Sequence, residues 1–250
     1  MSETVTLTAP DGEIFAAYLA HPDSRPRGGL VLVHEIWGLT DHITDVADRL
    51  AGEGYVVLAP DILSHGGIEP SLGAELFALM NSSDEQARTA AQPRMREALA
   101  GAHAPEYAAW AVGALQAAVD RVASVAGVDG RIGTIGFCFG GTYAFLLAAT
   151  DDRIRAVAPF YGTAPDTARI AGIHAPVLAL YGGQDKALMD ALPAVRAQMA
   201  DAGVAFTPIV YDEAAHAFFN DTGTRYDAEA AADAWQRVTA FFASVLGATR

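Results

Sequence analysis

Cysteine is almost absent from this chain: Cys138 is the only one in 250 residues. A disulfide within the chain is therefore excluded, and a reducing compartment, the cytoplasm, is the expected location. The N-terminal residues MSETVTLTAPDGE contain neither a basic start nor an apolar run, so no signal peptide is expected. A run of about 18 uncharged apolar residues is also lacking, and we expect no membrane-spanning helix and no membrane partner.

Basic residues are scarce as well. The chain has 16 Lys and Arg against 30 Asp and Glu, which gives a formal net charge of −14 at pH 7. Because phosphate backbones are bound by clustered Lys and Arg, we expect no nucleic-acid partner. Hydrophobic residues are abundant, at 52% of the chain, which is typical of a compact globular protein. The sequence lacks repeats, low-complexity tracts and Pro/Gly/Ser-rich linkers, and it indicates one domain over residues 1–250.

Short apolar runs alternate with helical patterns along most of the chain. Two weakly alternating segments flank Asp11-Gly12 and predict an N-terminal β-hairpin. Buried strands are expected in GGLVLVHE, YVVLAP, RIGTIGF, IRAVAPFYG, PVLALYGGQD and FTPIVYD. Strands that alternate with helices predict an α/β fold, with a mostly parallel sheet flanked by helices. Residues 62–127 break this pattern and predict one long crossover helix preceded by an excursion over the strand ends.

The single cysteine lies in GFCFGG, between a predicted strand and a predicted helix. Gly136-x-Cys138-x-Gly140 has the spacing of a nucleophile elbow, with cysteine in place of serine. We expect a side chain at either glycine to clash where strand and helix close up, and Cys138 to adopt a strained backbone conformation that exposes its sulfur. The N-terminus of the helix would favour the thiolate. A lone cysteine is more often a small buried hydrophobic residue, but the glycines favour a nucleophile.

A cysteine nucleophile needs a base, and the base needs an acid to orient it. After this kind of elbow the chain order is acid, then histidine, each in a loop that follows a strand. Asp185 follows PVLALYGGQ and His216 follows FTPIVYDEAA, so both fit; a turn or N-cap aspartate is the alternative for Asp185. Asp190 and Asp212 are competing acids in less suitable places. We expect His34 at a strand end, where it helps to shape the site. Five other histidines are interpreted as surface or loop residues: His21, His42, His65, His103 and His174.

A metal site is the rival interpretation of HEIWGLTDH. His34-Glu35 lacks the second histidine of an H-E-x-x-H motif, because position 38 is glycine. Cys138 also has no neighbouring ligand in the sequence, and we expect neither a metal nor another cofactor. A redox role for the thiol would need a resolving cysteine, which the chain does not contain.

Four motifs in order, HEIWGL, GFCFGG, GGQD and AAHAFFN, resemble the dienelactone hydrolase (carboxymethylenebutenolidase) family over nearly the whole chain. The resemblance implies the α/β-hydrolase fold, with Cys138 as nucleophile, Asp185 as acid and His216 as base. It also implies a carboxylate that holds the thiol at rest, two oxyanion-hole amides and a substrate pocket. These are Glu35 for the carboxylate, the backbone amides of Ile36 and Phe139, and Trp37 and Tyr161 in the pocket.

The predicted function is hydrolysis of activated esters or lactones through a thioester on Cys138; a non-catalytic small-molecule binding protein on the same fold is the alternative. The partner is a small-molecule ester or lactone, and the sequence indicates neither its identity nor the oligomeric state. Family members that act on dienelactone carry an arginine for the substrate carboxylate where this chain has Asn220. We therefore expect Asn220 to line the pocket and neutral or differently shaped substrates to be preferred over dienelactone. The resemblance implies a second arginine from the excursion, for which Arg88, Arg94 and Arg96 are the candidates. Arg225, farther along the loop, is the candidate that compensates for the missing one.

Overall fold

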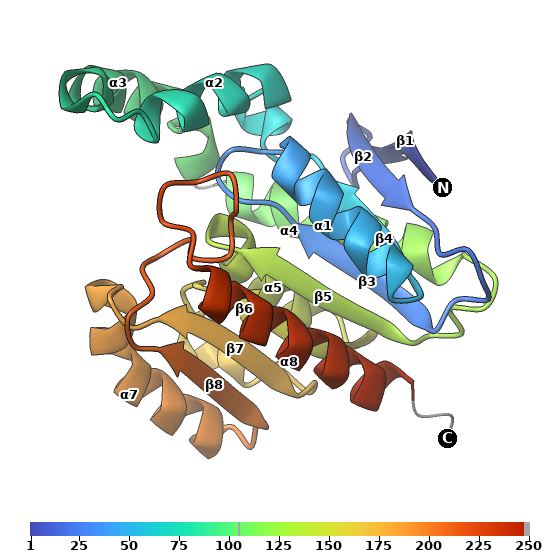
Figure 1. The fold of residues 1–250 in the computed structure, drawn as a ribbon. Helices are drawn as coiled ribbons and strands as arrows, with labels where there is room; N and C mark the ends of the chain where they lie inside the picture. Colours follow the sequence, from blue (N-terminus) through green and yellow to red (C-terminus); the bar gives the residue numbers. More distant parts are fainter. Residues whose placement is uncertain (105, 248–250) are drawn as a thin grey trace.

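A computed structural model describes residues 1–104 and 106–247, apart from the side chain of His103. Its core is an eight-stranded sheet in the order β1-β2-β4-β3-β5-β6-β7-β8, with helices on both faces (Figure 1). In the described residues, no helix is long and apolar enough to cross a membrane. The predicted α/β fold is confirmed.

The strands match the predicted segments closely. The hairpin strands β1 (Ser2–Thr8) and β2 (Ile14–Ala20) are antiparallel, and β2 also pairs antiparallel with β4. The other pairs, from β4 across to β8, are parallel. The remaining strands are β3 (Gly28–Val33), β4 (Tyr55–Pro60), β5 (Ile132–Phe137), β6 (Ile154–Phe160), β7 (Val177–Gly182) and β8 (Phe206–Tyr211).

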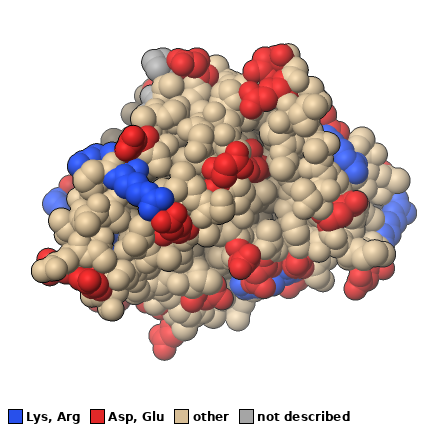
Figure 2. All heavy atoms as spheres, turned by 90° about the horizontal axis from the view of Figure 1, so that it is seen from above, with Lys and Arg blue, Asp and Glu red and all other residues tan. Residues whose placement is uncertain are grey.

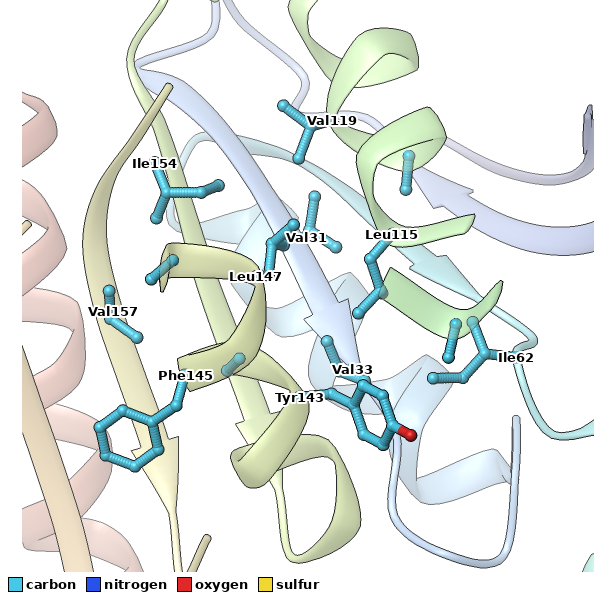
Figure 3. Close-up of a cluster of buried hydrophobic side chains, with 14 of the residues drawn as sticks. Val31, Val33, Ile62, Leu115, Val119, Tyr143, Phe145, Leu147, Ile154 and Val157 are labelled. Carbon is cyan, nitrogen blue, oxygen red and sulfur yellow. The ribbon is translucent and has the colours of Figure 1, made fainter. Parts of the chain in front are cut away.

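Two helical layers bury the two faces of the sheet. One layer holds α1 (Asp41–Gly52) and α8 (Ala228–Leu246), and the other holds α4 (Tyr107–Ala123), α5 (Phe139–Thr150) and α7 (Lys186–Asp201). In β3, Leu30 and Leu32 face the first layer, whereas Val31 and Val33 face the second. Figure 3 shows the second contact, with Val31 and Val33 beside side chains of α4 and α5. Apolar residues on both faces explain why the strands are continuous hydrophobic runs.

The excursion forms two helices, α2 (Pro70–Met80) and α3 (Glu85–Ala98). They lie away from the sheet, beyond the carboxyl ends of the parallel strands (Figure 1). We call residues 70–98 the α2–α3 segment. Three short helical turns complete the chain: η1 (Ser64–Gly66), η2 (Gly101–His103) and α6 (Thr167–Ile170). The long crossover helix expected after the excursion is α4.

Candidate active site

Cys138 lies in a sharp turn between β5 and α5. Its backbone has φ 55° and ψ −113°, a strained conformation for a residue with a side chain. A Cβ at Gly136 would lie 2.1 Å from the carbonyl oxygen of Gly140, and one at Gly140 would lie 2.1 Å from that of Val33. The steric reason predicted for both glycines is confirmed. The elbow leaves Cys138 half-buried at the carboxyl end of the sheet.

Backbone strain is concentrated around this cysteine. In the described residues, four non-glycine residues have positive φ, and three of them lie at the site: Cys138, Tyr161 and Ala217. They follow β5, β6 and β8, which places all three at the same edge of the sheet. Such strain persists where the surrounding structure holds it, and functional sites are common places for it.

His216 and Asp185 are in direct contact. Nδ1 of His216 lies 2.5 Å from Oδ2 of Asp185. The other carboxylate oxygen of Asp185 accepts a 3.4 Å hydrogen bond from the backbone N–H of Leu188, so the residue also caps α7. The N-cap alternative for Asp185 is confirmed, and the same side chain also contacts His216. Asp190, one competing acid, pairs instead with Lys186 at the surface.

Glu35 is buried beside Cys138, immediately after β3. Oε2 accepts a 2.6 Å hydrogen bond from Nδ2 of Asn220, and Oε1 accepts a 3.5 Å bond from the hydroxyl of Tyr161. Burial raises the pKa of Glu35 to about 7, although these two bonds act in the opposite direction. Oδ1 of Asn220 accepts from both the backbone N–H and the hydroxyl of Thr222. This fixes the orientation of the amide, with its NH₂ group toward Glu35.

The surroundings of Cys138 favour the neutral thiol over the thiolate. Burial and then the negative charge of Glu35 raise its pKa to about 12, while the backbone N–H of Phe139 and the charge of Arg225 lower it. We expected the start of α5 to favour the thiolate. That effect is outweighed, because desolvation and the neighbouring carboxylate both favour the neutral form.

His34 shapes the site as predicted. It is fully buried, with Nδ1 2.7 Å from the carbonyl oxygen of Glu35 and Nε2 accepting a 3.2 Å bond from the N–H of Ile62. Because Nε2 accepts, Nδ1 carries the proton and donates to Glu35. Burial lowers the pKa of His34, in keeping with a neutral ring. Through its bonds to Glu35 and Ile62, His34 connects the loop after β3 to the loop after β4.

The interpretation of His42 as a surface residue is wrong. His42 is buried in α1, against the rings of Phe137 and Phe219, and Nδ1 lies 3.1 Å from Oδ1 of Asp221. The sequence contained a signal for this burial, because His42 lies next to Ile43 and four residues before Val46 in the apolar pattern of the helix. The side chain of His103 lies outside the described residues.

A hollow of about 190 Å³, partly open to solvent, lies against Cys138 and His216. Trp37 and Asn220 line it, as expected, together with Glu35 and Ile36. Tyr161 does not line it: this residue lies on the other side of Cys138, with its hydroxyl toward Glu35. The sequence did not indicate the wall that the α2–α3 segment and its flanking residues contribute. That wall consists of Phe77, Met80, Asn81, Met95 and Leu99.

Among the described Lys and Arg side chains, only that of Arg225 lines this hollow. Arg94 forms a bidentate ion pair with Glu75, between α3 and α2. Arg88 donates to the carbonyl oxygen of Ser82. Acidic side chains are scattered over the face of the molecule on the side of α2 and α3 (Figure 2). In the parts of the chain that the structure describes, no group of three His, Cys, Asp or Glu side chains is arranged to hold a metal ion.

Residues 15–246 match the dienelactone hydrolase family. A protein of Saccharolobus solfataricus, provisionally named carboxymethylenebutenolidase, is 34% identical, with 94% of this chain and 96% of the relative covered. A similarly named protein of Escherichia coli K12 is 30% identical, with 92% and 83% covered. A crystal structure from Klebsiella pneumoniae, provisionally named dienelactone hydrolase, has a TM-score of 0.79 and 29% identity, and covers 97% of this chain and 99% of its own. Together with the α/β-hydrolase fold, these similarities show that the chain belongs to the dienelactone hydrolase family of hydrolases.

Proposed function

We propose that this protein hydrolyses activated esters or lactones through a thioester on Cys138, with His216 as base and Asp185 as the acid that orients it. The contact between Nδ1 of His216 and Oδ2 of Asp185, beside the cysteine elbow, carries this proposal. It leaves Nε2 of His216 available for proton transfer. The four strand ends that supply these residues and Glu35 belong to one sheet, so we propose that residues 1–250 act as one catalytic domain.

The reaction is acyl transfer to sulfur and then to water. His216 takes the thiol proton, the sulfur of Cys138 attacks the carbonyl carbon, and the carbonyl oxygen becomes an oxyanion. When the C–O bond breaks, the proton passes from His216 to the leaving alkoxide. His216 then deprotonates a water molecule that attacks the thioester, which releases the carboxylic acid and restores the thiol.

Two backbone amides are proposed to stabilise the oxyanion: those of Ile36 and Phe139. The N–H of Phe139 lies close enough to the sulfur of Cys138 to lower its pKa. The hydrogen bond from His34 to the Glu35 carbonyl holds the backbone just before Ile36. Donors fixed in advance where charge develops lower the barrier, because they need no reorganisation during the reaction.

Glu35 is proposed to hold the thiol in its resting state and to move as substrate enters. Its negative charge raises the pKa of Cys138, so a small change in its position changes the amount of thiolate. The bonds from Asn220 and Tyr161 define the resting position. The sulfur then becomes reactive only in the presence of substrate.

The substrate is proposed to be neutral near Asn220. Both ends of this amide already have partners, Glu35 and Thr222, which leaves little hydrogen-bonding capacity for a substrate carboxylate. An activated ester or an enol lactone suits a thiol nucleophile, because its leaving group departs easily. The single thiol also favours a reducing compartment, and we propose that the protein acts in the cytoplasm.

The experiment is a screen of lactones and aryl esters, neutral and anionic, against the wild-type protein and Cys138→Ala. We expect hydrolysis by the wild type and its loss in the variant, with the circular dichroism spectrum unchanged. Stoichiometric labelling of Cys138 by iodoacetamide without hydrolysis of any of these compounds would instead indicate a binding protein on the same fold.

A further inference from the structure

Two hollows meet at Cys138 and His216. The first is the one already described, under the α2–α3 segment. The second has a volume of about 280 Å³, is partly open to solvent, and shares only Cys138 and His216 with the first. Its other lining residues are Phe139, Thr142, Tyr161, Thr163, Asp185, Ala187 and Leu188. Cys138 and His216 therefore lie between two hollows that are lined by different residues.

The first hollow suits an apolar group. Trp37 and Phe77 form an edge-to-face pair with ring centroids 5.6 Å apart, and Met80 and Met95 extend this wall. The α2–α3 segment also contacts the loop after β8, because Oδ1 of Asn81 accepts from the N–H of Thr224 at 3.2 Å and from its hydroxyl at 3.1 Å. An aromatic or branched alkyl group would be well covered here.

The second hollow suits an uncharged group. Oγ1 of Thr142 accepts a 3.0 Å bond from the N–H of Thr163, which fixes one side of it. Ala187 and Leu188, at the start of α7, form the other side. The carboxylate of Asp185 also lines this space and would repel an anion.

The shapes of the two substrate classes distinguish how they would use this arrangement. In an open-chain ester, the acyl chain and the alcohol group leave the reacting carboxyl group in different directions. In a lactone a ring joins them, so one hollow can hold both. The reacting carbonyl carbon must lie beside the sulfur of Cys138, and the leaving oxygen beside His216. That is where the two hollows meet.

We propose that this site accepts open-chain esters, with an apolar half under the α2–α3 segment and an uncharged half between Thr142, Thr163 and Ala187. The inference rests on the proposed function, and it adds a second subsite to it. The chemistry is unchanged: the S–C bond forms, the C–O bond breaks, and the leaving alkoxide takes its proton from His216.

The test fills the second hollow with Ala187→Trp. Ala187 is exposed, so the fold should tolerate the larger side chain. Ala197→Trp, at another exposed position of α7 that does not line this hollow, is the matched control. The probes are propyl 4-phenylbutanoate, 4-phenylbutyl propanoate and a γ-lactone that carries a phenylethyl group. The measured quantity is the ratio of kcat/KM for each ester to that for the lactone.

Excluding a propyl-sized group should lower this ratio about tenfold for at least one ester in Ala187→Trp, and leave it unchanged in Ala197→Trp. A ratio that stays within twofold for both esters, or one that rises, overturns the two-sided site. If the wild type hydrolyses none of these probes, whose alcohols are poor leaving groups, the proposed function is decided separately by the screen of lactones and aryl esters. The inference is then tested by calorimetric binding of the same probes to Cys138→Ala and to the double variant Cys138→Ala, Ala187→Trp. A rise of about tenfold in the ratio of Kd for an ester to Kd for the lactone supports the second subsite. A ratio that stays within twofold for both esters overturns it.

Discussion

Asn220 donates a 2.6 Å hydrogen bond from its side-chain amide to the buried carboxylate of Glu35, across 185 positions of the chain. Thr222 donates to the amide oxygen at the same time, through both its N–H and its hydroxyl. Asn220 thus holds the carboxylate that we propose restrains the thiol. By the resemblance to the family, it also stands where dienelactone enzymes carry an arginine for the substrate carboxylate. The first prediction concerns these two tasks.

Wild-type protein should hydrolyse the methyl ester of dienelactone with a higher kcat/KM than dienelactone itself. Asn220→Arg should move this preference toward the free acid by roughly ten- to a hundredfold, because a charge-assisted bond replaces a neutral one. Asn220→Ala, which removes the amide without adding charge, is the control. A clear wild-type preference for the free acid would contradict the prediction, and its loss in Arg225→Ala would assign the carboxylate to Arg225.

The stability of the protein should depend on the protonation of Glu35. Burial raises the pKa of this carboxyl from 4.5 to about 7, so its stabilising contribution is complete below pH 4.5 and is lost as the pH rises through 7. A difference of about 2.5 pH units corresponds to roughly 3 kcal/mol. The free energy of unfolding of the wild type, from urea titrations, should therefore fall by this amount relative to Glu35→Gln between pH 4.5 and pH 8. Parallel curves for the two proteins would show that Glu35 ionises normally.

Alkylation of Cys138 by iodoacetamide should be slow at neutral pH, because its pKa is raised to about 12. Glu35→Gln removes the neighbouring charge and should increase the rate about tenfold, whereas burial keeps it below that of a free thiol. Asp190→Asn, which removes a surface carboxylate paired with Lys186, is the control and should leave the rate unchanged. Equal rates in Glu35→Gln and wild type would mean that Glu35 does not restrain the thiol.

The apolar wall of the first hollow should contribute to binding. Met95→Ala should lower kcat/KM for 4-nitrophenyl 4-phenylbutanoate relative to 4-nitrophenyl acetate by about tenfold, because apolar contact area is lost only for the larger acyl group. Met189→Ala, on α7 and outside this hollow, is the matched control. An equal effect of Met95→Ala on both esters would point to a change in fold rather than in the pocket.

Local chemistry explains which parts of the site were predictable from sequence. The glycines around Cys138 are needed because a side chain at Gly136 or Gly140 would clash with nearby backbone. This requirement lies within the six residues GFCFGG, so the sequence predicted the elbow and its strain. Asp185 and His216 follow strands whose carboxyl ends meet at one edge, so their contact follows from the order of the elements. The continuous apolar runs predicted the central strands β3 to β7, because these bury both faces. The expectation of a buried strand was wrong for β8, which lies at the edge of the sheet and has no buried residue.

The remainder depends on contacts that no local pattern encodes. Phe77 and Met95 belong to helices whose apolar residues face the site rather than the sheet, and their spacing does not reveal that partner. The sequence places Asn220 in a loop, and only the structure shows that its amide donates to Glu35. His42 is a different case, because its position four residues before Val46 on the buried face of α1 was a local signal. Only its aromatic partners, from β5 and the loop after β8, required the structure.

The most direct test of the proposed chemistry is to identify the acylated residue during turnover. The wild type is mixed with 4-nitrophenyl acetate, quenched in acid within the burst phase, digested and analysed by mass spectrometry. The peptide that contains Cys138 should carry the acetyl group, and hydroxylamine should remove it, as expected of a thioester. Sustained turnover with the acetyl group on another residue, or with no acyl-enzyme while Cys138→Ala retains full activity, would contradict the assignment of Cys138 as the nucleophile.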